Sequence, residues 1–202
     1  MGIRELRQGE SALARRSRFR LFGGYPVPDG LQAVLEGMLV NKLSENQEHL
    51  TEIYRKQAKG YDASGIGSLN TWRKEAIRVL NLKPGNVVVD IGCGTGLNFP
   101  LLQEVVGSEG RIIGVDLTDA MLDQARQRVT EHGWKNVELV QSDAARYSFP
   151  SQVDGIISTF ALTFIPDCGR VIENGCKTLT GGRKWVVLDM TWPDGLPVLL
   201  RQ

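Results

Sequence analysis

Three glycines at alternate positions, Gly92, Gly94 and Gly96, form the pattern best suited to binding chemistry. They lie between a β-branched run at residues 87–91 and a helix expected to begin near Leu97. Glycine allows positive φ angles and has no Cβ, so a ligand can lie directly on the main chain, and a helix start adds unpaired N–H donors. The pattern predicts a ligand-binding loop. The alternative is a tight strand-to-helix turn that needs glycine for its own geometry.

The glycine spacing discriminates between nucleotide ligands. A dinucleotide fingerprint has the form Gly-x-Gly-x-x-Gly, and its sixth position counted from Gly92 is Leu97. This disfavours NAD and FAD. No Gly-Lys-Ser/Thr follows the glycines, which excludes a phosphate-binding P-loop.

Two acidic residues follow later apolar runs. Asp116, twenty residues beyond Gly96, ends the next predicted strand, where a carboxylate can accept hydrogen bonds from both hydroxyls of a ribose. An N-cap role is the alternative, although Thr118 is already available as a cap. Asp143 follows the third strand and could accept an adenine amino proton, while Ala144 leaves room for the base. A surface aspartate in a loop is the alternative for Asp143.

The elements that must position these residues alternate along the chain. Apolar runs rich in β-branched residues predict buried strands, at residues 87–91, 112–115, 137–140, 153–157 and 185–188. Helical spacing lies between them, most clearly over residues 119–131 and 170–179. The sequence therefore predicts an α/β protein with a Rossmann-like, doubly wound, mostly parallel sheet. Ligands of such sheets bind beyond the carboxyl ends of the strands.

We expect three parts in the chain: residues 1–30 as an Arg-rich tail and linker, 31–82 as N-terminal helices that form a lid, and 83–202 as the core. The tail is interpreted as disordered, with a docking arm as the alternative. A further hypothesis is that translation starts at Met38.

Three helices are expected before the core. The first has apolar residues at helical spacing over residues 31–39, and the second places Leu50, Ile53, Tyr54 and Tyr61 on one face. The third begins with Ser68 as its N-cap and ends before 83–85. Its apolar face is expected to hold Leu69, Trp72, Ala76 and Leu80.

The composition excludes several classes of protein. In 202 residues, 24 Lys and Arg against 23 Asp and Glu leave a formal charge of +1, which gives no electrostatic reason to expect nucleic acid or an anionic membrane as partner. Three cysteines without a CxxC pair and two distant histidines disfavour a disulfide framework and a zinc site, and fit a reducing cytoplasm. No apolar run approaches the ~20 residues of a transmembrane helix, and no secretory signal is recognisable.

Together these motifs resemble the class I S-adenosylmethionine-dependent methyltransferases. The matching segments follow one another in the order and spacing of that family, at residues 88–96, 114–122, 142–144, 154–166 and 181–189. The resemblance implies an enzyme that uses S-adenosylmethionine. It also implies that the glycine loop contacts the methionine part of the cofactor, that Asp90 lies near its amino group and that Asp116 holds the ribose.

The resemblance assigns the remaining parts of the cofactor as well. Leu117 and Met121 would sandwich the adenine, and Asp143 with Ala144 would bind its edge. Two tyrosines of the pre-core helix resemble the lid aromatics that close over the cofactor in small-molecule members. The complete set of cofactor-binding residues so implied is Tyr54, Tyr61, Asp90, Gly92, Cys93, Gly94, Gly96, Asp116, Leu117, Met121, Asp143, Ala144 and Thr159.

The implied reaction is an in-line displacement at a sulfonium methyl group. It needs an acceptor nucleophile ~3 Å from the methyl carbon, a pocket with little water and no metal. The acceptor would enter over residues 158–164, which are mostly apolar. The chain lacks the Asn/Asp-Pro-Pro-Tyr/Phe stretch of families that methylate bases and glutamine. This favours a small or lipid-like acceptor, such as a quinone-like ring or a secondary metabolite, over nucleic acid.

No general base is identified from the sequence. His132 precedes Gly133 at a helix end, where a solvated C-terminal position is the expected role. His49 is expected on an exposed helix surface, with a position facing the acceptor as the alternative. Cys93 is expected to be small and buried.

The end of the chain departs from the family pattern. The family sheet has seven strands and ends in an antiparallel hairpin, but only twelve residues follow Met190. The strand at 185–188 would then be an unpaired apolar edge, open to self-association. Either the chain is a fragment, which is the preferred interpretation and implies weak activity, or a partner covers the edge. The rival functions are a module that binds S-adenosylmethionine or S-adenosylhomocysteine without turnover and, less favoured, an NAD(P)-dependent oxidoreductase.

Overall fold

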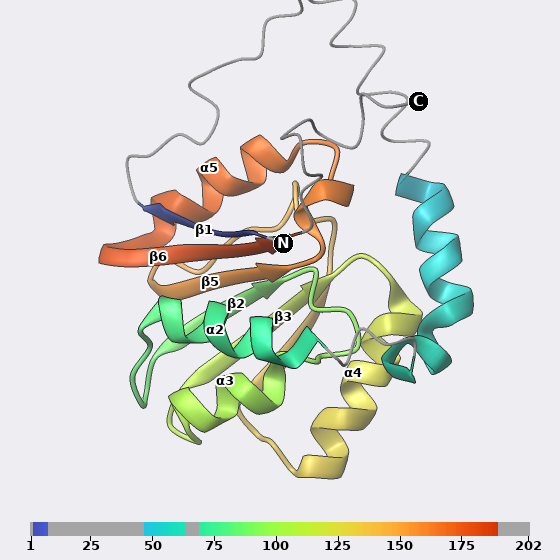
Figure 1. The fold of residues 1–202 in the computed structure, drawn as a ribbon, viewed down its shortest axis with the longest axis horizontal. Helices are drawn as coiled ribbons and strands as arrows, with labels where there is room; N and C mark the ends of the chain where they lie inside the picture. Colours follow the sequence, from blue (N-terminus) through green and yellow to red (C-terminus); the bar gives the residue numbers. More distant parts are fainter. Residues whose placement is uncertain (1, 8–46, 64–68, 190–202) are drawn as a thin grey trace, which may run out of the picture.

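A six-stranded sheet is the centre of the computed structural model, which describes residues 2–7, 47–63 and 69–189. The strand order is β1-β6-β5-β2-β3-β4, and all neighbours are parallel except β1 and β6 (Figure 1). The strands are β1 Gly2–Arg7, β2 Val87–Ile91, β3 Arg111–Asp116, β4 Val137–Gln141, β5 Val153–Thr159 and β6 Leu179–Asp189. The strand order reverses at β2, so the predicted doubly wound, mostly parallel α/β fold is confirmed.

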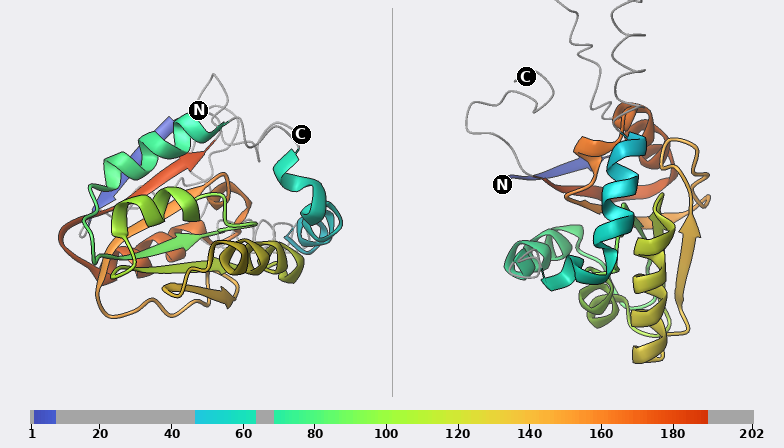
Figure 2. Two further views of the ribbon diagram at one scale, coloured as in Figure 1. Left: turned by 90° about the horizontal axis from the view of Figure 1, so that it is seen from below. Right: turned by 90° about the vertical axis from the view of Figure 1, so that its right-hand side faces the viewer.

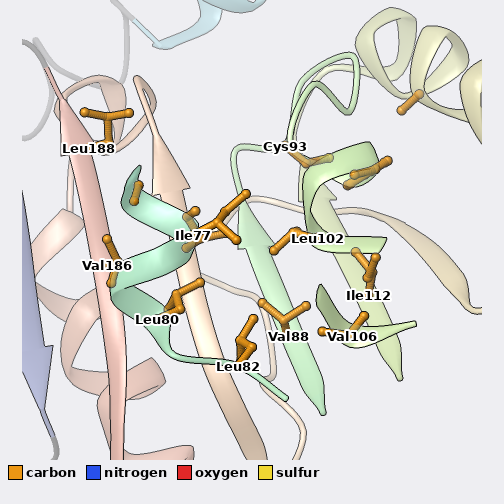
Figure 3. Close-up of a cluster of buried hydrophobic side chains, with 14 of the residues drawn as sticks. Ile77, Leu80, Leu82, Val88, Cys93, Leu102, Val106, Ile112, Val186 and Leu188 are labelled. Carbon is orange, nitrogen blue, oxygen red and sulfur yellow. The ribbon is translucent and has the colours of Figure 1, made fainter. Parts of the chain in front are cut away.

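Helices cover both faces of this sheet. Residues of α2, α3 and α4 share a buried cluster with one face, and residues of α5 share a second cluster with the other. In Figure 3, Ile77 of α2 and Leu102 of α3 lie over Val88 of β2. The helical elements after residue 57 are η1 Ala58–Ala63, α2 Asn70–Leu80, α3 Phe99–Val106, α4 Asp119–His132, η3 Leu162–Phe164 and α5 Cys168–Thr178.

The central strands are apolar on both faces because both faces are buried. Successive side chains of a strand point to opposite sides, so Val88 packs toward α2 and α3 while Val89 packs in the cluster that contains α5. Asp90, which is 0% exposed, is the exception within β2. An isolated buried carboxyl group is costly unless it is hydrogen-bonded, so its position in the central strand points to a site at this end of the sheet.

The segments before the core differ in part from the predicted helices. Residues 47–57 are helical, but Tyr61 lies in η1 rather than on that helix. Trp72 was expected on the apolar face of α2 but is 43% exposed, whereas its neighbour Arg73 is buried. The helix packs on the sheet and ends at Leu80, followed by Asn81 in the left-handed conformation. The predicted helix at 31–39 and the proposed cap Ser68 lie outside the described residues.

The prediction that the strand at 185–188 is an unpaired edge of the sheet is wrong. β1 pairs antiparallel with β6 over its whole length, from Gly2 opposite Asp189 to Arg7 opposite Lys184. Residues 2–7 belong to the segment expected as an Arg-rich tail, and their charged residues are typical of an edge strand. In the described chain β1 therefore occupies the edge on which self-association was expected. No helix in the described ranges has the length and apolar character needed to cross a bilayer.

Candidate active site

A pocket lies at the carboxyl ends of the parallel strands. The helix of residues 47–57 lies beyond these strand ends (Figure 2, left). The loops after β2, β3, β4 and β5 contribute the floor and walls of the pocket, and residues 47–61 contribute its outer side. Its lining comprises Gln47, Leu50, Thr51, Tyr54, Tyr61, Gly92, Gly94, Val115, Asp116, Leu117, Thr118, Met121, Ser142, Ala144, Thr159, Phe160, Ala161, Phe164 and Ile165. Apolar side chains predominate, with a few polar groups concentrated on the strand ends.

The glycine loop brings main chain to the floor of the pocket. Gly92 has a φ of +69°, and a Cβ at this position would lie 2.3 Å from Cβ of Ala161. Gly94 has a φ of +56°, and its N–H donates to Oδ2 of Asp116 at 2.8 Å. Both positions therefore require glycine. Gly96 instead packs against Phe99, where its Cβ would come within 2.5 Å of the ring.

Asp116 is positioned by main-chain donors on both oxygens. Oδ2 accepts from the N–H of Gly94 and Oδ1 from the N–H of Thr118, each at 2.8 Å. Burial raises the pKa of this carboxyl group, and the hydrogen bonds from these N–H groups oppose the rise. A carboxylate can accept further hydrogen bonds on each oxygen. Asp116 is thus a fixed acceptor on the pocket wall, suited to a ligand with paired hydroxyl groups.

A buried polar network lies at the β2 end of the pocket. Both oxygens of Asp90 accept from Nδ2 of Asn98, at 3.1 and 3.0 Å. Nη1 of Arg73 donates to Oδ1 of Asn98 at 2.9 Å and to Oγ1 of Thr159 at 2.5 Å. Of these four residues, Thr159 reaches the pocket surface. The network joins α2, β2 and the end of β5.

The network contains two buried ionisable groups, Asp90 and Arg73, and one of its hydrogen-bond donors has no partner among the described residues. Burial raises the pKa of Asp90 to about 7, although the hydrogen bond from Asn98 and the charge of Arg73 oppose the rise. Arg73 is 4% exposed, burial lowers its pKa, and its Nε has no hydrogen-bond partner among the described residues. Its guanidinium carbon lies 5.3 Å from the ring centroid of Phe160, which has a φ of +58°. Buried orphan donors are rare in native proteins, so this one points to a ligand group.

Three aromatic rings close the outer side of the pocket. The Tyr54 ring makes edge-to-face contacts with Tyr61 and Phe164, at centroid distances of 5.9 and 6.3 Å. Phe164 is 40% exposed. The pKa of Tyr54 is raised to about 12, mainly by burial, so its hydroxyl stays protonated at neutral pH. The rings thus come from residues 47–63 and from η3, and they meet on one side of the pocket.

Polar contacts attach residues 47–63 to the core. Asp62 accepts a hydrogen bond from Oγ1 of Thr95 at 2.6 Å and forms an ion pair with Arg128 of α4. Nε of Arg128 in turn donates to the carbonyl oxygen of Thr95 at 2.9 Å. A second pair joins Arg55 to Asp119 at 3.0 Å. Residues 47–63 are therefore attached directly to the glycine loop and to α4.

Comparison with known proteins identifies the family. The model of the ubiE/COQ5 methyltransferase family matches residues 41–198. The chain belongs to this family. A demethylmenaquinone methyltransferase of Bacillus cereus is 29% identical over 152 residues, 73% of this chain and 64% of that protein. One of Lactobacillus johnsonii is 30% identical over 166 residues, 79% of this chain and 67% of that protein. The chain thus spans about two thirds of the length of these relatives.

Solved structures share the fold of this ubiE/COQ5-family chain. A SAM-dependent methyltransferase from Aquifex aeolicus has a TM-score of 0.60 and 24% identity, over 71% of this chain and 78% of that one. The DhpI-SAM-HEP complex has a TM-score of 0.60 and 24% identity, over 75% of this chain and 68% of the other.

The structure brings most of the predicted site residues of this ubiE/COQ5-family chain to one pocket, and places four of them elsewhere. Asp90 is buried behind the pocket surface, and Gly96 packs on Phe99. Cys93 is buried, with its sulfur 3.0 Å from the place where a Cβ on Gly114 would stand. Asp143 accepts from its own loop. The predicted residues that line the pocket are Tyr54, Tyr61, Gly92, Gly94, Asp116, Leu117, Met121, Ala144 and Thr159.

The most important residues missed from the sequence are Arg73 and Asn98. Arg73 shares a helix face with Ile77 and Leu80, at the spacing i, i+4, i+7. An arginine on the apolar face of a helix is the signal that could have found it. Both histidines are exposed, as expected, and Nδ1 of His132 lies 2.9 Å from the carbonyl oxygen of Arg128.

Proposed function

We propose that this protein is an S-adenosylmethionine-dependent methyltransferase that acts on a small, apolar, quinone-type acceptor. The observation that carries the proposal is a single pocket with two unlike ends. One end presents glycine main chain, Asp116 and Thr159, and the Arg73–Asp90 network is buried behind Thr159. The other is walled by aromatic and aliphatic side chains, among them Phe164 and Ile165.

The residues present fit an adenosyl amino acid. The unsatisfied Nε of Arg73 would be satisfied by the methionine carboxylate, and Asp90 would stabilise the ammonium group. The free acceptor positions on Asp116 suit the two ribose hydroxyls. A side chain at Gly94 would extend toward Met121, whose Cε lies 3.4 Å from the Cβ position. Glycine here keeps the main chain accessible to the ligand.

The chain's contribution to the reaction is positioning and exclusion of water. When bound, S-adenosylmethionine supplies a methyl group that a nucleophile displaces in line. The glycine loop and Asp116 fix the ligand, and holding two reactants in line accounts for much of the acceleration in such reactions. Tyr54, Tyr61 and Phe164 cover the pocket, which keeps water from the reacting groups.

The acceptor class follows from the aromatic side chains that line the pocket. Flat aromatic side chains such as Phe160 and Phe164 favour a planar ring by stacking and edge contacts. The curated relatives are named demethylmenaquinone methyltransferases, which supports a quinone-derived ring. The proposal includes a cytoplasmic location, supported by three free cysteines, Cys93, Cys168 and Cys176. It also includes a lid formed by residues 47–63.

Calorimetric titration with S-adenosylhomocysteine and with NAD tests the proposal. The chain should bind S-adenosylhomocysteine, and the Asp116→Ala variant should lose at least about tenfold in affinity because the ribose loses its acceptor. Asp123→Ala is the matched control, since Asp123 is an exposed aspartate of α4 paired with Arg126. Binding of NAD alone, or equal affinity of the Asp116→Ala variant, would refute the assignment. Labelled S-adenosylmethionine with a hydroxylated naphthoquinone then tests turnover, and binding without transfer would favour a non-catalytic module.

A further inference from the structure

Tyr54 lines the pocket from the helix of residues 47–57. The residues of this helix that line the pocket are Gln47, Leu50, Thr51 and Tyr54, at the spacing i, i+3, i+4 and i+7 of one helix face. Tyr54 is the aromatic member of this set. One face of the helix therefore covers the pocket and carries a phenol group.

The ring of Tyr54 is positioned by two other rings of the pocket lining. Its centroid lies 5.9 Å from that of Tyr61 and 6.3 Å from that of Phe164, with interplanar angles of 65° and 70°. Edge-to-face pairs at such distances are favourable. Phe164 belongs to η3, which follows β5. The two contacts fix the ring and with it the place of the hydroxyl oxygen, which lies in the plane of the ring.

The Tyr54 hydroxyl is a neutral hydrogen-bond donor. Burial raises its pKa to about 12, and interactions with Tyr61, Asp116 and Asp189 add to the rise, so the group keeps its proton at neutral pH. Tyr54 is half-buried, and its hydroxyl has no hydrogen-bond partner among the described residues. Its proton is therefore available to a molecule bound in the pocket.

Other hydroxyl groups of the pocket lining already have partners. The hydroxyl of Thr51 donates to a carbonyl oxygen of its own helix at 2.7 Å, and that of Ser142 donates to a carbonyl oxygen of its own loop at 3.0 Å. The side chain of Thr118 bonds to the carboxylate of Asp116, and Oγ1 of Thr159 accepts two hydrogen bonds from the buried network. Of these hydroxyl groups and that of Tyr54, only the last has no partner among the described residues.

We propose that the Tyr54 hydroxyl donates a hydrogen bond to a ring oxygen of the methyl acceptor and so determines the specificity of the pocket for an oxygenated ring. This inference rests on the proposed function, in which the acceptor lies against aromatic side chains such as Phe164, the neighbour of Tyr54. A quinone-type ring carries oxygen atoms that lose water when they enter a mainly apolar pocket. Burial of such an oxygen is costly unless a protein donor replaces the water.

The aromatic rings and the hydroxyl thus have separate roles in recognition of the acceptor. Phe160 and Phe164 supply apolar contact area, which any flat ring of suitable size can use. A hydrogen-bond donor within an apolar pocket instead discriminates against a ring that lacks the matching oxygen, because the donor is then left without a partner. Tyr54 is therefore a residue that touches the acceptor rather than only a cover over the cofactor.

Tyr54→Phe tests the proposal, since phenylalanine keeps the ring contacts with Tyr61 and Phe164 and removes only the hydroxyl. The two probes are 2,3-dimethyl-1,4-naphthoquinone and 2,3-dimethylnaphthalene, which share one carbon skeleton and differ in the two oxygens. Equilibrium dialysis against protein saturated with S-adenosylhomocysteine measures both affinities. The wild type should prefer the quinone. Tyr54→Phe should bind the quinone about three- to tenfold more weakly, the loss expected for one neutral hydrogen bond, and the hydrocarbon with unchanged affinity.

Tyr147→Phe is the matched control, because Tyr147 is also half-buried and packs edge-to-face, on Phe149, but is not among the residues that line the pocket. This variant should keep the wild-type preference for the quinone. The affinity of Tyr54→Phe for S-adenosylhomocysteine should equal that of the wild type, which also shows that the variant is folded.

Three results would overturn the role of Tyr54. One is an unaltered preference for the quinone in Tyr54→Phe, and another is an equal loss of affinity for both probes, which would indicate packing alone. The third is a loss of affinity for S-adenosylhomocysteine, which would assign the hydroxyl to the cofactor. Failure of the wild type to bind S-adenosylhomocysteine would instead refute the proposed function.

Discussion

Nη1 of Arg73 donates a hydrogen bond to Oγ1 of Thr159 at 2.5 Å, which joins α2 to the end of β5 across 86 residues of sequence. The same nitrogen donates to Asn98, which donates to Asp90. Three elements of the fold therefore meet at one guanidinium group. Arg73 is buried and its Nε is unsatisfied, which supports the proposed contact of this network with an anionic group of the cofactor.

Replacement of this arginine by lysine should weaken cofactor binding. Lysine keeps the charge but cannot donate in a planar fork, so Arg73→Lys cannot hold Asn98, Thr159 and a carboxylate together. We expect the affinity for S-adenosylhomocysteine to fall about tenfold or more, a range typical of a lost hydrogen bond between charged groups. Calorimetric titration with S-adenosylhomocysteine measures this loss of affinity. Arg78→Lys, on the same helix but exposed and paired with Glu75, is the control. Equal affinities of the two variants would contradict this role.

The pKa of Asp90 makes the stability of the ligand-free protein depend on pH. An unfolded aspartate titrates near pH ~3.9, whereas Asp90 in the folded protein titrates at about 7. Below the lower value both states are protonated and stability is full. Between the two the unfolded state releases its proton first, so stability falls as pH rises through this window. The loss amounts to about a few kcal/mol.

Asp90→Asn tests this linkage, since asparagine cannot ionise and still accepts from Asn98. The variant should gain Tm relative to the wild type as pH rises from about 4 to about 8. Thermal unfolding of both proteins across that range measures the difference. A Tm difference that stays constant with pH would show that Asp90 does not titrate in this window.

Buried parallel strands were predictable because their apolar runs are continuous. The predicted strand at 87–91 coincides with β2, since both faces of that strand are covered. β6 begins six residues earlier than predicted, at Leu179. Its first half contains Gly181 and Gly182 and passes through a register irregularity between the pairs of Val153 and Gly155. No apolar pattern marks such a segment.

The polar part of the site was less predictable than its glycines. Asp116 follows directly from its place at the end of a strand, whereas Asp62 and Arg128 are 66 residues apart and meet only in the folded chain. Periodicity reports which face of an element is buried but not which polar groups face each other across the fold.

The attachment of the lid should control the residence time of the ligand. Arg128→Met removes the ion pair to Asp62 and the hydrogen bond to the carbonyl oxygen of Thr95. Both charged groups are partly exposed, so we expect a change in unfolding free energy of about 1 kcal/mol or less. Dissociation of S-adenosylhomocysteine, followed by stopped-flow tyrosine fluorescence, should become several-fold faster. Arg126→Met is the exposed control on the same helix. Equal dissociation rates would argue against a latch.

Alanine substitutions at Gly92, in the glycine loop, and at Gly85, outside it, separate two effects: the backbone cost of a positive φ and the clash of an added Cβ. Both glycines have positive φ, +69° and +85°, so alanine at either position carries a similar backbone penalty of about 1 kcal/mol. At Gly85 no atom lies within 4 Å of the added Cβ, whereas at Gly92 that Cβ would meet Ala161 at 2.3 Å. Gly92→Ala should therefore lower Tm clearly more than Gly85→Ala.

The same pair of variants distinguishes a ligand-binding loop from a turn that needs glycine only for its own geometry. Relief of the contact at Gly92 must displace Ala161 or the loop that carries it, and both positions line the pocket. We expect Gly92→Ala to lose affinity for S-adenosylhomocysteine by about tenfold or more, a loss equivalent to about 1.4 kcal/mol, while Gly85→Ala keeps the wild-type affinity. If Gly92→Ala lost stability but bound the ligand normally, the loop would be structural.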